Sequence, residues 1–298
     1  MQFGGELAAL GAAACWGIGS NFFVAAGRRM GSQRLNRLRL TAALLFLCTT
    51  LWFLKGSPWP TWAARRDILL LGASGLVGFV IGDRGYFRSL VILGAGRATL
   101  ISSTSAIFAA IMARIFLHET LGLRAVGGIA LTLGGLAYVM TERLERVKDH
   151  AEGSIAVGIL VGAFSALCSS VGYMLSRQGL QHGLDPLSGT VVRAVAATIG
   201  VWLLVPFEGG FRHNFDALRD RTAARAMLGG AVFGPFIGVT LSLVALQRTE
   251  TGVATTLMSA HPLVAMLIAA RAHGERLTRR LLLGALITLA GVALLFLR

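Results

Sequence analysis

A chain of 298 residues in which 55% are hydrophobic and only 14% are charged is not a soluble domain, because a soluble protein of this size has about 25% charged residues. Apolar runs recur along the whole chain, so lipid is the expected solvent for most of its surface. The net charge of +14 does not indicate nucleic-acid binding, since most basic residues lie between the apolar runs, where a membrane protein uses them to fix its orientation.

Ten apolar stretches have about the 20 residues that a helix needs to cross the hydrocarbon. In chain order they lie near residues 5–25, 35–54, 68–90, 97–117, 123–141, 154–176, 187–207, 227–246, 252–272 and 280–297. Their apolar runs are continuous rather than alternating, which indicates helices and not the strands of a barrel. The sequence therefore predicts an all-α integral membrane protein with a first repeat at 1–141, a polar linker at 142–153 and a second repeat at 154–298.

The two sets of five spans are copies of one another. Residues 78–137 match residues 234–293 at a constant offset of 156, with 14 identities in the 42 residues from 96 to 137. Because five is an odd number, the second copy must enter the membrane upside down relative to the first, which predicts two five-helix inverted repeats. Such repeats are typical of secondary transporters, which hold a substrate near the midplane and open it to each side in turn.

Two stretches, residues 94–137 and 251–293, resemble the end of an EamA domain, in which a helix of small residues leads to an LGE-type turn and a glycine-rich span. Glu119 and Glu275 occupy the acidic position of that turn, and Pro262 matches the mid-span proline of the family. The resemblance covers nearly the whole chain as two tandem domains. It implies an inner-membrane permease of the drug/metabolite transporter superfamily, of the group that includes bacterial amino-acid and metabolite exporters.

The orientation of the chain in the membrane is open. The odd-numbered connections carry more basic residues than the even-numbered ones, which places the odd connections in the cytoplasm. Relatives in the superfamily are instead described with both termini in the cytoplasm. We expect both termini on one side of the membrane, without assigning the side.

Ionisable groups inside spans are costly in lipid and are candidates for function. The densest cluster lies in the third span, where Asp83 shares a helix face with Tyr86, while Arg84 and Arg88 share an adjacent face. One interpretation is a polar wall of a translocation cavity, with an arginine that binds a substrate carboxylate. The alternative is that the span ends near Gly82 and the cluster lies at the membrane interface.

Further cavity candidates are aromatic or polar residues in three other spans. Trp16 and Asn21 lie in the first span and Tyr173 in the equivalent span of the second half, where they either line a pocket or pack between helices. His261 in the ninth span is either a proton or substrate group or a hydrogen-bonded residue between helices.

Two prolines are candidate hinges. Pro235 follows Gly234 in the eighth span, and Pro262 lies in the ninth, where the first half has Ala106 instead. A proline removes a backbone donor and favours a kink, which leaves carbonyl oxygens free for a ligand or a hinge. A kinked helix with a purely structural role is the alternative.

Five other charged residues are expected to serve structure. Glu6 resembles the glutamate in the first span of the small multidrug relatives, which couples transport to protons. Because Glu6 lies at the very start of its span, we expect it at the membrane interface instead. Arg39 and Arg193 resemble the arginine that opens the second span of each EamA domain; we expect them to anchor span ends or pair with a carboxylate, with substrate contact as the alternative. Glu119 and Glu275 are expected to cap the spans that follow them.

The sequence contains no Walker A pattern, no metal-ligand cluster and no cysteine spacing typical of a metal site, so we expect neither an enzyme nor a cofactor. The predicted function is export of small metabolites, with amino acids as the leading class. The expected partners are a small-molecule substrate and the lipid bilayer, and no nucleic acid. Alternatives are transport of a cationic drug, a sugar derivative or a purine, or a receptor-like or lipid-processing membrane protein. The direction, the energy coupling and the choice between monomer and homodimer are open.

Overall fold

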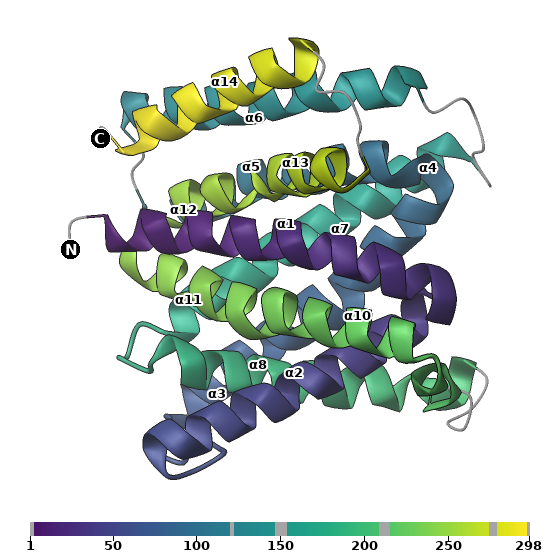
Figure 1. Ribbon diagram of the computed structural model, residues 1–298. Helices are drawn as coiled ribbons and strands as arrows, with labels where there is room; N and C mark the ends of the chain where they lie inside the picture. Colours follow the sequence, from purple (N-terminus) through teal and green to yellow (C-terminus); the bar gives the residue numbers. More distant parts are fainter. Residues whose placement is uncertain (1–2, 120–121, 147–153, 209–214, 274–278, 297–298) are drawn as a thin grey trace.

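The computed structural model describes residues 3–119, 122–146, 154–208, 215–273 and 279–296, nearly all of them helical (Figure 1). The first half contains α1 (Gly4–Met30), α2 (Ser32–Lys55), α3 (Arg65–Gly75), the π-helical η1 (Leu76–Gly82), α4 (Asp83–Ser103), α5 (Ser105–Phe116) and α6 (Leu123–Arg146). The second half contains α7 (Ile155–Gly179), α8 (Pro186–Leu203), η2 (Val205–Glu208), η3 (Ala217–Arg219), α10 (Arg221–Ala231), the π-helical η4 (Val232–Gly238), α11 (Val239–Arg248), α12 (Thr251–Met258), α13 (His261–His273) and α14 (Arg279–Phe296). No strand occurs in these ranges, which confirms the predicted all-α class.

Seven helical stretches of the described chain are long and apolar enough to cross a membrane: Gly4–Met30, Ser32–Lys55, Arg65–Ser89, Ile155–Gly179, Pro186–Leu203, Arg221–Arg248 and Thr251–Ile268. Three shorter apolar helices cover Ile101–Phe116, Leu123–Tyr138 and Leu282–Phe296. All of them fall on predicted spans. The membrane fold is thus confirmed, whereas a count of ten crossings stays a prediction.

The sequence predicted a connection between the third and fourth spans at residues 91–96. This prediction is wrong, because α4 continues through these residues as one helix. In the second half the equivalent region does break: α11 ends at Arg248, Thr249 is extended, and Glu250 precedes α12. The first half has Leu93 and Gly94 at the positions of Thr249 and Glu250.

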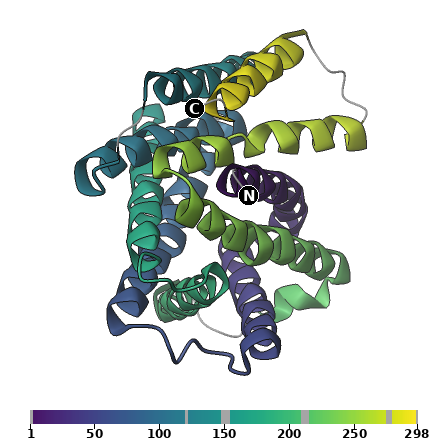
Figure 2. The same cartoon turned by 90° about the vertical axis from the view of Figure 1, so that its left-hand side faces the viewer.

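The expected linker also begins inside a helix, since α6 continues to Arg146. Residues 147–153 lie outside the described residues. Near the two chain ends, the rings of Phe3 and Phe296 lie 5.5 Å apart, which places the start of α1 and the end of α14 at one end of the molecule (Figures 1 and 2). This agrees with the expectation of both termini on one side.

The first helix of each half packs into the other half. α1 contacts α10, α11, α12 and α13, while α7 contacts α3, α4 and α5. The last helices, α6 and α14, pack against each other along one side of the molecule (Figure 1). Glycines allow their close approach: a methyl group on Gly135 would lie 2.6 Å from the Thr288 nitrogen, and one on Gly291 would lie 2.5 Å from the Thr132 nitrogen.

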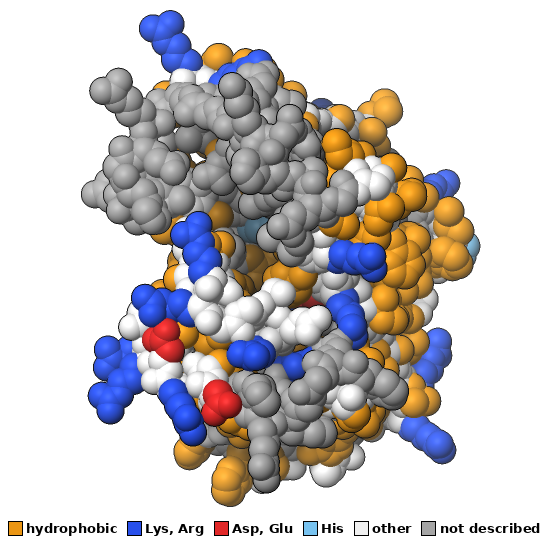
Figure 3. All heavy atoms as spheres, turned by 90° about the vertical axis from the view of Figure 1, so that its right-hand side faces the viewer, with side chains coloured by type: hydrophobic (Ala, Val, Ile, Leu, Met, Phe, Trp, Pro, Cys, Tyr) orange, Lys and Arg blue, Asp and Glu red, His pale blue; other side chains and the backbone are white. Residues whose placement is uncertain are grey.

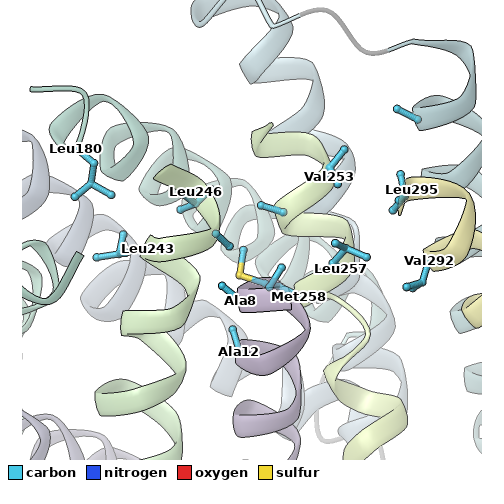
Figure 4. Packing of buried hydrophobic residues seen from close by; sticks show 14 of the residues in the cluster. Ala8, Ala12, Leu180, Leu243, Leu246, Val253, Leu257, Met258, Val292 and Leu295 are labelled. Carbon is cyan, nitrogen blue, oxygen red and sulfur yellow. The ribbon is translucent and has the colours of Figure 1, made fainter. Parts of the chain in front are cut away.

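Large apolar side chains cover the outside of the helices. Phe53 is 86% exposed and Leu160 is 68% exposed, which suits lipid rather than water. Buried apolar residues hold the helices together. One cluster joins Ala8 and Ala12 of α1 to Leu246 of α11 and Leu257 of α12 (Figure 4).

Candidate functional site

The two π-helical segments occupy equivalent positions in the two halves. η1 and η4 are separated by the same offset of 156 as the sequence repeat, and each lies between two α-helical segments of a longer helix. Pro235 in η4 corresponds to Phe79 in η1, so the π turn occurs with and without proline. Because π turns leave irregular backbone and are frequent at functional sites, this pair marks the middle of each half as a candidate site.

A cavity of about 250 Å³ lies where the two π-helical segments face the first helices of both halves. We call it the central cavity. It is lined by seven of the residues singled out in the sequence: Trp16, Asp83, Tyr86, Tyr173, Gly234, Pro235 and His261. Its wall also contains Arg39 and Arg193, the rings of Phe23 and Phe79, and several serines. Elements of both halves therefore form one amphiphilic site.

An ion pair links α2 to α4 in the cavity wall. Arg39 donates to the Asp83 carboxylate through Nη2, and its Nε donates to Asn36 Oδ1 at 2.9 Å. The guanidinium carbon of Arg39 also lies 4.8 Å from the centroid of the Phe23 ring. The charge of Asp83 is thus balanced within the protein, and its side chain is only 26% exposed.

The second arginine of the cavity has no such partner. Arg193 in α8 is 3% exposed, and its guanidinium carbon lies 5.0 Å from the centroid of Phe79. Its Nε and Nη1 have no hydrogen-bond partner in the described part of the chain. The backbone of Arg193 is closely packed, since a methyl group on Gly75 would lie 2.4 Å from its carbonyl oxygen. The cavity therefore contains a buried cation held in place by its surroundings.

His261 and Trp16 form the part of the wall next to α12. Their rings meet edge to face with centroids 6.1 Å apart. His261 Nδ1 lies 3.2 Å from the Met258 carbonyl oxygen, which can only accept a hydrogen bond. Nδ1 is therefore the donor, and in the neutral ring Nε2 is left as an acceptor.

Three predicted residues lie elsewhere. Arg84 and Arg88 line a neighbouring pocket of about 390 Å³ together with Arg37, so the predicted cluster is divided between two pockets. Adjacent residues of a helix point about 100° apart around its axis, so Asp83 and Arg84 lie on different faces. Asn21 is a helix-contact residue whose Nδ2 donates to Gly17 O at 2.9 Å and to Ala265 O at 3.4 Å.

Pro262 is buried at the start of α13, after a break that separates α12 from α13. The first half breaks at the equivalent place, Thr104, between α4 and α5, although it has Ala106 instead of proline. The break therefore does not depend on the proline.

Arg39 pairs with the carboxylate of Asp83, which is one of the roles expected of it, and both Arg39 and Arg193 line the central cavity. A signal for this was present: each is a charge followed by a long apolar run, at equivalent points of the second span of each half. Glu6 is more buried than an interfacial residue, at 6% exposure, and accepts a hydrogen bond of 3.0 Å from Thr249 Oγ1. Glu275 lies outside the described residues.

Glu119 caps a helix, but not the one that follows it. Its carboxylate accepts from Thr251 N at 2.7 Å and from Thr251 Oγ1 at 2.8 Å, at the start of α12 in the other half. Arg177 Nε lies 3.7 Å from Glu119 Oε1, and its Nη1 donates to Thr249 O at 2.7 Å. We call Glu6, Glu119, Arg177, Thr249 and Thr251 the terminal cluster, because they join the two halves at the end where the chain termini lie (Figure 1).

The opposite end of the molecule carries many basic side chains. Figure 3 shows this face, where Lys and Arg side chains surround a recess. The pocket with Arg37, Arg84 and Arg88 also contains Ser32 and Gln33 from the start of α2, which places it at this end. A recess also lies at the terminal end, where a pocket of about 880 Å³ is lined by Glu6, Arg177 and Thr249 of the terminal cluster.

Comparisons with known proteins agree with this architecture. The model of the EamA-like transporter family matches residues 3–141 and 156–297. The chain is 28% identical over 158 residues to the uncharacterized transporter YvbV of Bacillus subtilis (strain 168), a match that covers 52% of this chain and 48% of that protein. The chain therefore spans about half the length of that relative.

A second relative is the uncharacterized protein PA1977 of Pseudomonas aeruginosa (strain PAO1), which is 26% identical over 264 residues, covering 87% of this chain and 82% of that protein. A solved crystal structure has a TM-score of 0.75 at 17% identity and covers 97% of this chain and 95% of that chain. At this identity the likeness shows the fold.

Proposed function

This chain belongs to the EamA-like transporter family, and we propose that it is a secondary transporter that exports small metabolites, with amino acids as the leading class, across the inner membrane. The single observation that carries the proposal is the central cavity, because equivalent π-helical segments of the two halves meet in its wall. A site between two repeats is where inverted-repeat transporters bind their substrates.

The packing of the halves supports alternating access. α1 contacts α10 and α11, and the equivalent α7 contacts α3 and α4, so each half holds the first helix of the other in the same way. A pseudo-two-fold axis in the membrane plane would produce this exchange. In the described state the terminal cluster joins the two halves at one end; in the other state we expect this cluster to separate and the halves to approach at the opposite end.

The chemistry of the cavity supports a small amphiphilic substrate. Its volume of about 250 Å³ lies below the range of about 300–1,000 Å³ that is usual for drug-sized ligands. Aromatic rings offer an apolar surface, and serine hydroxyls and arginines offer polar contacts, which suits a molecule of amino-acid size. Two arginines against one aspartate make a cationic drug the weaker candidate.

Counterflow in proteoliposomes tests the proposal. Purified protein is reconstituted with an excess of each unlabelled amino acid inside, and uptake of the same radiolabelled amino acid is followed against empty liposomes. We expect transient accumulation for at least one amino acid. A panel in which no amino acid exceeds empty liposomes would refute the proposed substrate class.

A further inference from the structure

The two arginines of the central cavity occupy equivalent positions but have different surroundings. Arg39 is the eighth residue of α2 and Arg193 the eighth residue of α8. Asp83 is the first residue after η1, and Val239 is the first residue after η4. The first half therefore pairs its arginine with a carboxylate, whereas the second half has a buried valine, 4% exposed, at the position of that carboxylate.

The missing carboxylate leaves a buried cation in need of a partner. Arg193 has two buried guanidinium nitrogens without a hydrogen-bond partner in the described chain, and the ring of Phe79 lies against its charge. Asp83 and Tyr173 are near enough to interact with it electrostatically, but Asp83 forms its ion pair with Arg39. A buried charge without a hydrogen-bonded counterion is destabilising, and more so in a membrane, where water is scarce. With Asp83 paired to Arg39, the arginines and the aspartate of the cavity leave one positive charge uncompensated.

We propose that Arg193 binds the carboxylate group of the transported substrate, which takes the place that Asp83 holds beside Arg39 in the first half. The inference rests on the proposed transport function and names its substrate class: small molecules with a carboxylate and an apolar body. A guanidinium matches a carboxylate with two parallel N–H donors, which an amide or an alcohol cannot replace. The class includes amino acids and the corresponding acids without an ammonium group.

Binding to the purified full-length protein in detergent tests the inference directly. The probes are L-phenylalanine, 3-phenylpropionate and L-phenylalaninamide at equal concentration, and the readouts are the shift in melting temperature and the dissociation constant by calorimetry. We expect the acids to bind and the amide not to bind. Comparison of the two acids distinguishes an amino-acid site from a site for carboxylic acids in general.

Variants assign the effect to Arg193. Arg193→Gln should weaken binding of the acids about tenfold or more, whereas Arg193→Lys should retain part of it. Val239→Asp supplies the missing carboxylate, so it should raise the melting temperature without ligand and abolish the response to the acids. Val239→Asn, which has nearly the same shape without the charge, is the matched control and should still respond.

The outcomes separate this inference from the proposed function. Equal binding of acid and amide, an unchanged response in Arg193→Gln, or no response of the wild type to either acid would overturn the role of Arg193. The wild-type comparison of acid and amide holds even if a variant fails to fold. Counterflow of amides at the same rate as acids would support transport but refute the requirement for a carboxylate. Acid-specific binding without any counterflow would refute the transport proposal.

Discussion

Replacement of Glu119 by glutamine should shift the protein toward the state that is open at the terminal cluster. The carboxylate of Glu119 is 11% exposed and accepts two hydrogen bonds, of 2.7 and 2.8 Å, from the first residue of α12. Glutamine keeps the shape and one acceptor oxygen but removes the charge. The change therefore weakens contacts that join the two halves at this end.

The magnitude follows from the difference between charged and neutral hydrogen bonds. A hydrogen bond to a charged group contributes about 1.5–3 kcal/mol and a neutral one about 0.5–1.5 kcal/mol, so two bonds lose about 2 kcal/mol together. Loss of the ion pair with Arg177 adds to this, although Arg177 keeps its carbonyl partner at Thr249. About 2 kcal/mol corresponds to roughly a 30-fold shift in the equilibrium between closed and open states.

Cysteine labelling measures this shift. The reporter is Ala9→Cys, at a position that is fully buried in the cluster between the central cavity and the terminal end. It is placed in a background without the native cysteines Cys15, Cys48 and Cys168. An impermeant maleimide on the terminal side should label the reporter up to about 30-fold faster in Glu119→Gln than in its parent.

Asp216→Asn serves as the matched control, because its carboxylate is 53% exposed and lies outside the terminal cluster. Its labelling rate should equal that of the parent. An unchanged rate in Glu119→Gln, or an equal increase in the control, would refute the assignment of the terminal cluster as a closure between the halves.

Three other outcomes are expected. Gly238→Ala should reduce transport, because its methyl group would lie 2.6 Å from an indole ring of the cavity wall, whereas Gly134→Ala, with open space around it, should not. The pKa of Asp220 is lowered chiefly by a hydrogen bond from an arginine and further by a backbone N–H at the start of α10, so its charge stabilises the fold above the usual aspartate range. Melting temperatures of the wild type and Asp220→Asn should therefore differ at neutral pH and converge as the pH falls through the lowered pKa, and a constant difference would contradict this. If Asp83 or His261 carries protons, transport by the variant Asp83→Asn or His261→Ala should no longer depend on a pH gradient. Transport that still depends on the gradient in both variants would exclude these two residues as proton carriers.

The sequence predicted the helices and seven residues of the cavity wall because both depend on local patterns. Continuous apolar runs locate the helices, and rare polar or aromatic residues within them, such as Trp16, Asp83 and Tyr173, face inward because lipid disfavours them. The resemblance to the EamA domain is confirmed. The expected break near residue 94 was wrong, because α4 continues through this position, where the first half has Leu93 and Gly94 in place of Thr249 and Glu250.

Local sequence patterns do not reveal contacts between residues that lie far apart in the chain. Glu119 caps a helix that begins 132 residues later, since the turn carries it to the other half rather than to the next helix. Arg39 and Arg193 are identical in type and position, and only the fold shows that one has a carboxylate partner and the other does not. The repeat nevertheless contained the clue, because Asp83 aligns with Val239.

Alternating access is the central claim, and a reversible cross-link at the terminal cluster tests it most directly. Glu119→Cys with Thr251→Cys, joined by a short cleavable thiol reagent, holds the two halves together where their native side chains meet. Counterflow of the amino acid exchanged by the wild type should stop on cross-linking and return after reduction. Counterflow at an undiminished rate in the cross-linked protein would contradict the account.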